Sequence, residues 1–369
     1  MKPVLLLVAT LILLLFTDSN RLLFAQQPRR KATSVTAIAV DGGGRWLATA
    51  SHEQVVGAAP RCVIRFWDIE NETLVSACDV ETGSIATMSF STDTKLMAID
   101  DLGQQYSLSP TAKNVERLTA PPMPGTRIAV VNPDTHRLLT IDDRIRLWED
   151  GKVAVTASSP DELPIVDATF LAGGSHLAIA TAKNTIWLHP RTFRELIHPS
   201  QHADPLTAFS VSGSEWGMVT FTGHNNGNVE YWHAGRGVLR RTIRAHPNSV
   251  THVAAYANGT RCVSLGDDGL LKFWEAETGK KLAEEFVPDS NDNHLASSVT
   301  GRVIALVSGN EAQIRTLDPS RADQVAKRWV FPVTGETPVE PMPKLPNLNL
   351  LRNWKTIRGD WKIVDGRIV

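Results

Sequence analysis

The residue types best suited to chemistry in this chain are a histidine, a serine and an aspartate that lie close together, His246, Ser264 and Asp268. In the right geometry, these three types can activate a nucleophile. However, Trp274 follows them, and the N–H group of a buried indole needs a hydrogen-bond acceptor. A hydroxyl, an imidazole and a carboxylate can pass hydrogen bonds from such a Trp out to a turn and make a core rigid. We therefore interpret the four residues as a structural tetrad and not as a catalytic site.

Turn signals divide the segment that holds the tetrad into short elements. Asn258-Gly259, Asp268-Gly269 and Thr278-Gly279 separate four runs of alternating residues, which cover residues 250–256, 261–264 and 270–275 and begin again at Lys281. This spacing predicts a four-stranded antiparallel unit. The segment resembles a WD40 repeat, with Glu275 where that family usually has Asp. The resemblance implies that His246, Ser264, Asp268 and Trp274 are the family's hydrogen-bonded tetrad.

The position of Trp274 recurs along the chain at intervals of 40 to 43 residues. We term these seven positions the blade marks: Trp67, Leu108, Trp148, His189, Trp232, Trp274 and Leu317. Four-stranded propeller blades repeat every 40 to 45 residues, roughly. The sequence therefore predicts an all-β, seven-bladed β-propeller of four-stranded antiparallel blades over residues 34–331. Amphipathic runs long enough for a helical solenoid do not occur in the sequence.

The repeats also predict local details. Blade 5 carries a second copy of the tetrad, made of His202, Thr222, Asn226 and Trp232. In blade 4, Trp187 lies two residues before its mark, so we expect it on the same strand face as the other marks. If residues 1–25 are removed as a leader, only residues 26–34 precede the first predicted strand, whereas residues 324–331 can supply the last one. We therefore expect the ring to close by packing between blades and not by a shared sheet.

The N-terminus has the order of a secretory signal. Lys2 is followed by an apolar run over residues 4–16, a polar break and a small residue, Ala25. The run is shorter than the roughly 20 residues that span a bilayer. We expect a signal peptide over residues 1–25 and export to the periplasm or the extracellular space. The alternative is an uncleaved N-terminal anchor, the one case in which we expect membrane association.

The C-terminus changes composition twice. Five prolines fall within residues 332–349, which predicts an extended linker. Residues 350–369 form a short β tail that contains Trp361, Ile363 and a turn at Asp365-Gly366. The tail resembles the start of a concanavalin-like domain of the 3-keto-disaccharide hydrolase type, with Ile363 in place of the usual Val. The resemblance implies a second domain that is truncated here.

Composition limits the possible functions. The formal net charge of −1 argues against an electrostatic nucleic-acid binder. Three Cys do not make a disulfide scaffold, and Cys62 and Cys78 are either paired on neighbouring strands or unpaired. His202, His224 and His246 should face one side of the ring, but two of them are tetrad members, so we expect no metal and no cofactor. A quinone-dependent dehydrogenase is the enzymatic alternative, since residues 275–279 faintly resemble its repeats.

The resemblance to WD40 repeats implies a non-catalytic scaffold that binds protein partners through loops on one face, and the signal-like N-terminus adds the expectation that it is exported. The largest departure from the repeat is the insertion over residues 52–61, on the face that also carries Asp142, His224 and Asp268. It is either an idle insertion or a partner contact whose residues are His52, Glu53, Val55, Val56 and Arg61. The alternative function is a sugar-active or sugar-binding envelope protein, to which the tail would belong.

Overall fold

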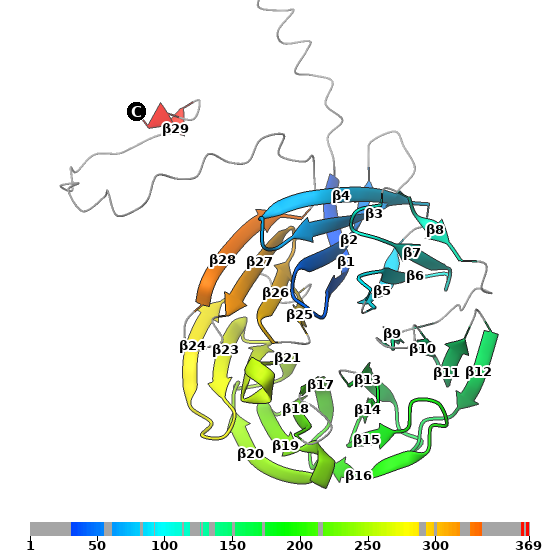
Figure 1. Ribbon diagram of the computed structural model, residues 1–369. Helices are drawn as coiled ribbons and strands as arrows, with labels where there is room; N and C mark the ends of the chain where they lie inside the picture. The colour runs from blue at the N-terminus through cyan, green and yellow to red at the C-terminus, as the bar shows by residue number, and fades with distance from the viewer. Residues whose placement is uncertain are drawn as a thin grey trace, which may run out of the picture. The chain divides into compact units, whose positions relative to one another are not determined.

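Seven four-stranded antiparallel sheets surround a central axis in the computed structural model (Figure 1). The predicted all-β, seven-bladed propeller is therefore confirmed. The structure describes residues 31–54, 61–81, 84–91, 93–112, 114–118, 126, 128–132, 137–149, 152–171, 174–212, 217–287, 293–298, 301–317, 325–333, 363–364 and 367–368. The predicted signal peptide (residues 1–25) and linker (residues 332–349) lie outside this part of the chain, except for residues 332 and 333.

Each blade uses four strands that are consecutive in the chain. Blades 1 and 2 are formed by β1 (Lys31–Val40), β2 (Trp46–Gln54), β3 (Arg61–Asp68), β4 (Thr73–Val80), β5 (Ile85–Phe90), β6 (Leu96–Asp100), β7 (Gln105–Leu108) and β8 (Glu116–Arg117). Blades 3 and 4 are formed by β9 (Ile128–Val131), β10 (Leu138–Ile141), β11 (Ile145–Glu149), β12 (Lys152–Ala157), β13 (Ile165–Phe170), β14 (Leu177–Thr181), β15 (Asn184–Leu188) and β16 (Glu195–Gln201).

Blades 5 to 7 follow the same plan. They are formed by β17 (Leu206–Ser212), β18 (Val219–His224), β19 (Asn228–His233), β20 (Val238–Arg244), β21 (Val250–Tyr256), β22 (Arg261–Gly266), β23 (Leu270–Glu275), β24 (Lys281–Phe286), β25 (Asn293–Ser297), β26 (Val303–Ser308), β27 (Glu311–Leu317) and β28 (Val325–Pro332). Two short 3-10 helices, η1 (Ala234–Arg236) and η2 (Ala257–Gly259), lie in turns.

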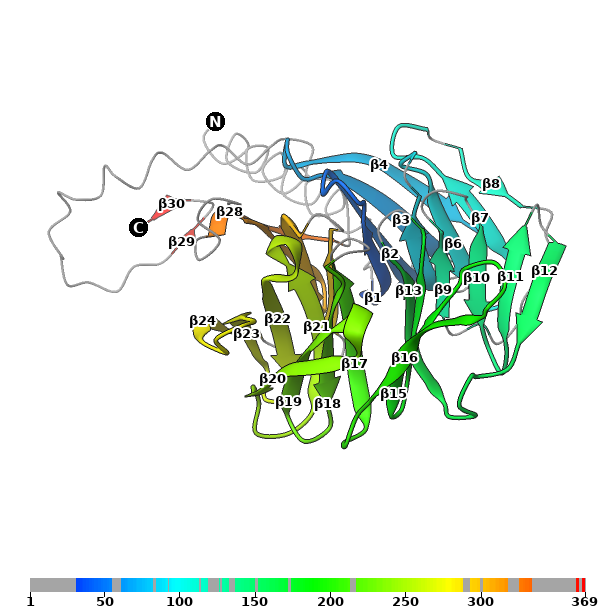
Figure 2. The same ribbon diagram turned by 60° about the horizontal axis from the view of Figure 1, so that its bottom comes forward.

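The first strand of every blade lies nearest the axis and the fourth lies outermost (Figure 1; Figure 2 gives a tilted view). Because the strands alternate in direction, the turns between second and third strands share one end of the ring with the loops that enter the next blade. We term this end the tetrad face. The turns between first and second strands, and between third and fourth strands, lie on the opposite face.

Apolar side chains fill seven layers, one between each pair of neighbouring blades. The layer between blades 5 and 6, for example, includes Phe221 and Tyr231 from blade 5 and Trp274 from blade 6. A single blade buries neither of its faces alone, so the ring is stable only when neighbouring blades pack.

The ring closes between blades 7 and 1 by packing, as the sequence predicts. β28 pairs with β27 at the outer edge of blade 7, and β1 pairs with β2 within blade 1. Across the joint, the ring centroids of Trp67 and Phe331 are 4.2 Å apart, and Trp329 stacks on Phe331 at 3.8 Å. The Nε2 atom of His294 lies 3.1 Å from the carbonyl oxygen of Val35 and adds a polar link.

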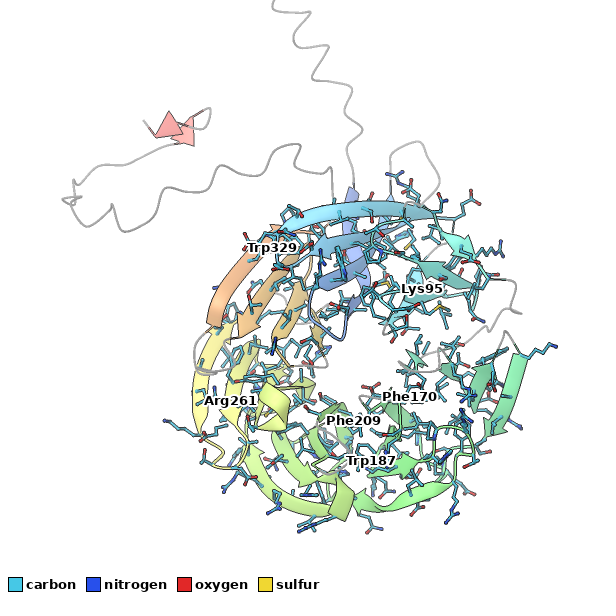
Figure 3. All side chains as sticks on the ribbon, viewed as in Figure 1. Lys95, Phe170, Trp187, Phe209, Arg261 and Trp329 are labelled. Carbon is cyan, nitrogen blue, oxygen red and sulfur yellow. The ribbon has the colours of Figure 1, made fainter. Side chains whose placement is uncertain are left out.

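The prediction for Trp187 is wrong. Trp187 is fully buried in the layer between blades 4 and 5, next to Phe209, whereas Trp148 and Trp274 face the preceding blade. The adjacent Leu188 packs toward the preceding blade instead. The mark in blade 4 is therefore shifted by one residue, and in a strand a shift of one residue moves a side chain to the other face. Figure 3 labels Trp187 and Phe209.

The chain divides into two units, residues 1–335 and 336–369. Within the second unit, β29 (Ile363–Val364) and β30 (Arg367–Ile368) pair antiparallel. The predicted Asp365-Gly366 turn lies outside the described residues. Among the described residues, no helix is both long enough and apolar enough to span a bilayer.

The joint between blades 7 and 1 gives a first prediction. Replacing Phe331, which is 7% exposed, by Ala should lower the free energy of unfolding by about 3 to 5 kcal/mol, because it opens a cavity beside Trp67 and Trp329. Denaturant unfolding measures the change. The control is Val330→Ala, since Val330 is 42% exposed and its loss should change stability by less than about 0.5 kcal/mol. Equal effects of the two substitutions would contradict packing at this joint.

Candidate functional site

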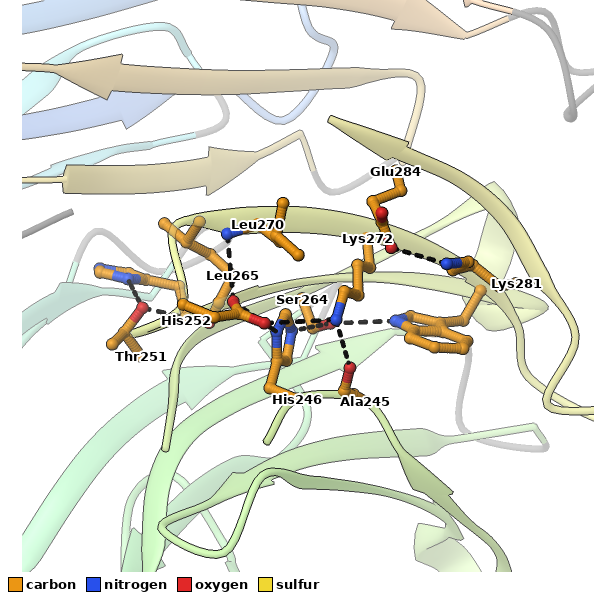
Figure 4. A network of polar contacts seen from close by, with 12 residues as sticks. Ala245, His246, Thr251, His252, Ser264, Leu265, Leu270, Lys272, Lys281 and Glu284 are labelled. Carbon is orange, nitrogen blue, oxygen red and sulfur yellow. Dashed lines mark hydrogen bonds and ion pairs between the residues drawn. The ribbon is translucent and has the colours of Figure 1, made fainter. Parts of the chain in front are cut away.

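The tetrad of blade 6 forms one continuous chain of hydrogen bonds (Figure 4). The indole N–H of Trp274 donates to the hydroxyl of Ser264 at 3.0 Å, and that hydroxyl lies 2.8 Å from Nε2 of His246. On its other side, Nδ1 of His246 lies 2.9 Å from a carboxylate oxygen of Asp268. Lys272 completes the network, because its ammonium donates to Asp268 at 3.3 Å and to the carbonyl of Ala245 at 2.8 Å.

Two glycines make room for His246, Gly266 for its imidazole and Gly227 for its backbone. A Cβ atom on Gly266 would lie 2.4 Å from Nδ1 of His246, and one on Gly227 would lie 2.0 Å from the carbonyl oxygen of His246. Gly227 also has φ +84°, a left-handed conformation that glycine adopts without strain. Its carbonyl accepts hydrogen bonds from the N–H groups of Ala245 and His246. The second turn of blade 5 thus holds the histidine of blade 6 in place.

Burial sets the charge states in this network. It lowers the pKa of His246, although the nearby carboxylate of Asp268 opposes the shift. Burial also raises the pKa of Asp268, but the N–H of Leu270 and the charges of His246 and Lys272 outweigh it and lower the pKa overall. The network thus favours a neutral imidazole beside an ionised carboxylate and an ammonium group.

The residues predicted for a second tetrad do not form the same chain. The amide of Asn226 turns outward and donates to Asp204 at 2.6 Å, and the hydroxyl of Thr222 lies 2.9 Å from Nε2 of His224. The indole N–H of Trp232 donates instead to Glu230 at 3.0 Å. His202 is connected to the same carboxylate. The predicted wiring of His202, Thr222, Asn226 and Trp232 is wrong because Glu230 takes the place of the tetrad serine and aspartate.

Glu230 is the centre of this blade 5 network. Its Oε2 atom lies 2.8 Å from Nδ1 of His202 and 3.3 Å from Nε2 of His224. Burial raises its pKa, but the hydrogen bonds from the two histidines outweigh that effect and bring the pKa to about 2. The sequence signal for Glu230 is its position two residues before the mark Trp232, where blade 6 has Lys272.

Four of the ten residues of the predicted insertion in blade 1, residues 52–54 and 61, lie in paired strands. β2 and β3 contain nine and eight residues, which makes them the longest second and third strands among the described blades. His52 pairs with Cys62, and Glu53 pairs with Arg61. Val55 and Val56 lie outside the described residues. The insertion therefore extends the β2–β3 hairpin on the tetrad face.

Glu53 is not the exposed charge that the sequence suggests. It is 1% exposed and forms an ion pair with the buried Arg65, while Arg61 lies 3.7 Å away. Arg61 is more accessible, and its guanidinium also contacts Asp79 at 3.0 Å. His52 is half-buried. Of the predicted contact residues that the structure describes, His52 and Arg61 can reach a partner and Glu53 cannot.

The three cysteines form no disulfide in the structure. Cys62 lies opposite Val80 and Cys78 lies opposite Ile64, so the two are offset along neighbouring strands. Both are buried in the layer between blades 1 and 2, and burial raises the pKa of the Cys62 thiol to about 11. Both are therefore core residues of this layer. Cys262 is a core residue of a different layer, the one between blades 5 and 6.

A cavity of about 590 Å³ occupies the channel near the opposite face. Its lining comes from the ends of the innermost strands and includes Phe170 and Phe209, which Figure 3 labels beside the central opening. Asp167 is a titratable group of the lining, and burial raises its pKa to about 6, partly offset by the N–H of Ala168. The blade 6 tetrad and the Glu230 network lie at the other end of the strands, so their residues do not line this cavity.

The ring and the tetrad together define a seven-bladed β-propeller that contains a WD repeat. Residues 237–275 match the WD40 family model, described as WD domain, G-beta repeat. This segment contains the tetrad members His246, Ser264, Asp268 and Trp274, which supports the resemblance seen in the sequence.

Three relatives show how far the similarity extends. The chain is 29% identical over 111 residues to polyadenylation factor subunit 2 of Candida albicans, which covers 29% of this chain and 20% of the relative. It is 29% identical over 116 residues to guanine nucleotide-binding protein subunit beta of Oryza sativa subsp. japonica, which covers 29% of this chain and 30% of the relative. It is 25% identical over 172 residues to WD repeat-containing protein 37 of Xenopus tropicalis, which covers 46% of this chain and 34% of the relative. The chain thus spans about a third or less of the length of these relatives.

The tetrad gives a second prediction. Replacing Trp274 by Ala should lower the free energy of unfolding by about 3 to 5 kcal/mol, because it removes a buried aromatic ring and the hydrogen bond to Ser264. Trp274→Phe keeps most of the ring and loses the N–H, so it should lose less. Denaturant midpoints of the two variants measure the difference. A near-zero effect of Trp274→Ala would show that the layer does not depend on this residue.

A third prediction concerns acid stability. The pKa of Glu230 is about 2 in the folded chain against an ordinary value of 4.5, so its stabilising effect is present above pH 4.5 and lost as the pH falls toward 2. This effect amounts to roughly 3 kcal/mol at most. The free energy of unfolding of the natural chain should therefore fall more steeply than that of Glu230→Gln across this window. Parallel curves in urea titrations at a series of pH values would contradict the shift.

Proposed function

We propose that this chain is a non-catalytic, exported scaffold that binds a protein partner through the tetrad face. The observation that carries the proposal is the burial of the groups that could have done chemistry. Ser264 is 0% exposed and His246 is 2% exposed, and each is engaged in the chain of hydrogen bonds that supports Trp274. A nucleophile must reach its substrate, whereas these residues reach only one another.

The similar proteins support a binding role. WD40 propellers are typically scaffolds for protein interactions, and two of the relatives are named as subunits. A rigid ring with variable loops suits this role, since binding residues gather on loops that a stable scaffold positions. The long β2–β3 hairpin is the largest such departure in the chain.

The neighbouring turn of blade 2 adds an apolar side chain to this surface. Leu102, in the turn between β6 and β7, is 66% exposed. The adjacent Asp101 lies close enough to Cys62 for its charge to raise the pKa of that thiol, although burial is the larger cause. Leu102 would then belong to the apolar part of the proposed contact, with His52 and Arg61 at its rim.

Export rests on the signal-like order of residues 1–25, and the site of action is then the periplasm or the extracellular space. The second candidate function is a sugar-active or sugar-binding envelope protein. The observation that favours it is the antiparallel pairing of β29 with β30, in the tail that resembles the start of a concanavalin-like domain.

The fourth prediction tests the proposed surface. The chain is recovered from the envelope and cross-linked to bound proteins. Its intact mass should correspond to a chain that begins at Gln26. Replacing Val55 and Val56 by Asp should abolish capture of a partner, because two carboxylates cannot be buried in an apolar contact. Folding should persist, since changes in surface loops usually alter stability by about 0.5 kcal/mol.

The matched control replaces Val238 and Leu239 by Asp, because both are exposed on β20 toward the opposite face. This variant should keep the partner. Loss of the partner in the control alone would show that the binding surface lies elsewhere. Capture of oligosaccharides and of no protein would favour the second candidate function.

A further inference from the structure

The charged residue on the third strand is a cation in four blades and an anion in blade 5. Two residues before the blade mark, a Lys or Arg pairs with a carboxylate: Arg65 with Glu53, Arg146 with Asp142, Lys272 with Asp268, and Arg315 with Glu285. Blade 5 has the anion Glu230 at this position. Within the described part of the chain, its ion-pair partners are His202 and His224, and neither is a Lys or an Arg.

The three side chains present one donor atom each toward a common point. Nδ1 of His202, Nε2 of His224 and a carboxylate oxygen of Glu230 all lie within 4.8 Å of one another. In a tetrahedral zinc site with bonds of about 2.0 to 2.1 Å, neighbouring donor atoms are about 3.3 Å apart. The separations from Glu230, 2.8 Å to His202 and 3.3 Å to His224, are close to that value.

The second nitrogen of each histidine already has a protein partner. Nδ1 of His224 lies 3.1 Å from the carbonyl oxygen of Asp204, and Nε2 of His202 lies 3.1 Å from the hydroxyl of Thr185. Histidines that bind metals almost always donate their other N–H to such a group, which fixes the ring and its tautomer. The indole N–H of Trp232 supports the third ligand, Glu230, in the same way.

We propose that His202, His224 and Glu230 bind one divalent transition-metal ion, with zinc as the best match to two imidazoles and one carboxylate. Imidazole ligands favour zinc and its neighbours over calcium and magnesium, which prefer oxygen. The ion would supply the positive charge that Lys272 supplies in blade 6. The proposal goes beyond the scaffold function and differs from the sequence-based expectation, which grouped His246 with the other two histidines and found no metal site.

Binding requires a shift of protons within the network. His224 keeps its proton on Nδ1, toward the carbonyl of Asp204, and releases to solvent the Nε2 proton that it donates to Glu230, so that the Nε2 lone pair is available for the ion. His202 moves its proton from Nδ1 to Nε2, where it donates to Thr185. The hydroxyl of Thr222 lies 2.9 Å from Nε2 of His224 and must turn away when the ion binds. A water molecule or this hydroxyl then takes the fourth coordination position.

The location gives the ion a structural role. His202 follows the last strand of blade 4, whereas His224 and Glu230 belong to β18 and β19 of blade 5. His202 and His224 are 5% and 1% exposed, so the ion would be shielded from substrates. It would fasten the segment that leads out of blade 4 to the centre of blade 5.

The test is a zinc titration of the full chain after treatment with a chelator, followed by calorimetry and by thermal unfolding. The natural chain should bind one Zn²⁺ per molecule with saturation and should unfold at a higher temperature with zinc than with the chelator. Glu230→Gln keeps the size of the side chain and removes its charge. It should lower the affinity by more than about tenfold, the smallest loss typical of an outer partner of a metal ligand.

The matched control is Asp268→Asn, which removes the carboxylate beside His246 in blade 6 and should leave zinc affinity unchanged. Co²⁺ provides a second measurement on the natural chain, which decides the matter if Glu230→Gln does not fold. Its absorption spectrum should show the intense visible bands of tetrahedral coordination. The proposal is overturned if the natural chain shows no saturable zinc binding, if Glu230→Gln binds as tightly, or if the cobalt spectrum is that of the hydrated ion.

Discussion

The structure depends on apolar packing between sheets that share no hydrogen-bonded strand. Each of the seven layers combines side chains from two neighbouring blades, and none of the sheets borrows a strand from another part of the chain. Because hydrophobic burial is not directional, the ring also needs contacts that fix one blade angle over others. The buried polar networks beside each layer are suited to this task, since their hydrogen bonds are short and directional.

These networks share a place in the fold and differ in chemistry. Blade 6 uses the His246, Ser264, Asp268 and Trp274 chain, with Lys272 as its cation. Blade 1 uses a buried Arg–Glu pair, and blade 5 uses a carboxylate with two histidines. In each case the polar side chains of one strand find partners at the joint with the preceding blade or near the turn between the second and third strands. The fold thus fixes where polar residues are needed and leaves open which ones meet the need.

Local signals in the sequence predict the repeat, the number of blades and the tetrad of blade 6. Turn residues such as Asp268-Gly269 and the spacing of Trp marks act over a few residues, so they can be read directly from the chain. The errors concern partners that the sequence does not place. Glu230 replaces two tetrad members because His202 and His224 approach it from other segments of the chain. Glu53 is buried because it forms an ion pair with Arg65 of the neighbouring strand. In blade 4, the mark on a strand without a tetrad is displaced by one residue, which reverses the face of Trp187.

The use of four consecutive strands in every blade has a consequence for how the chain is made. Each sheet pairs segments that are near neighbours in sequence, so its closure entropy is small and it can form as soon as its last strand is available. Successive blades can then add to a growing arc in the order in which the chain emerges, whether from a ribosome or from a membrane pore. Only the final joint unites distant segments, as the contact between His294 and Val35 shows. Until that joint forms, the intermediate is an open arc that exposes one apolar face at each end.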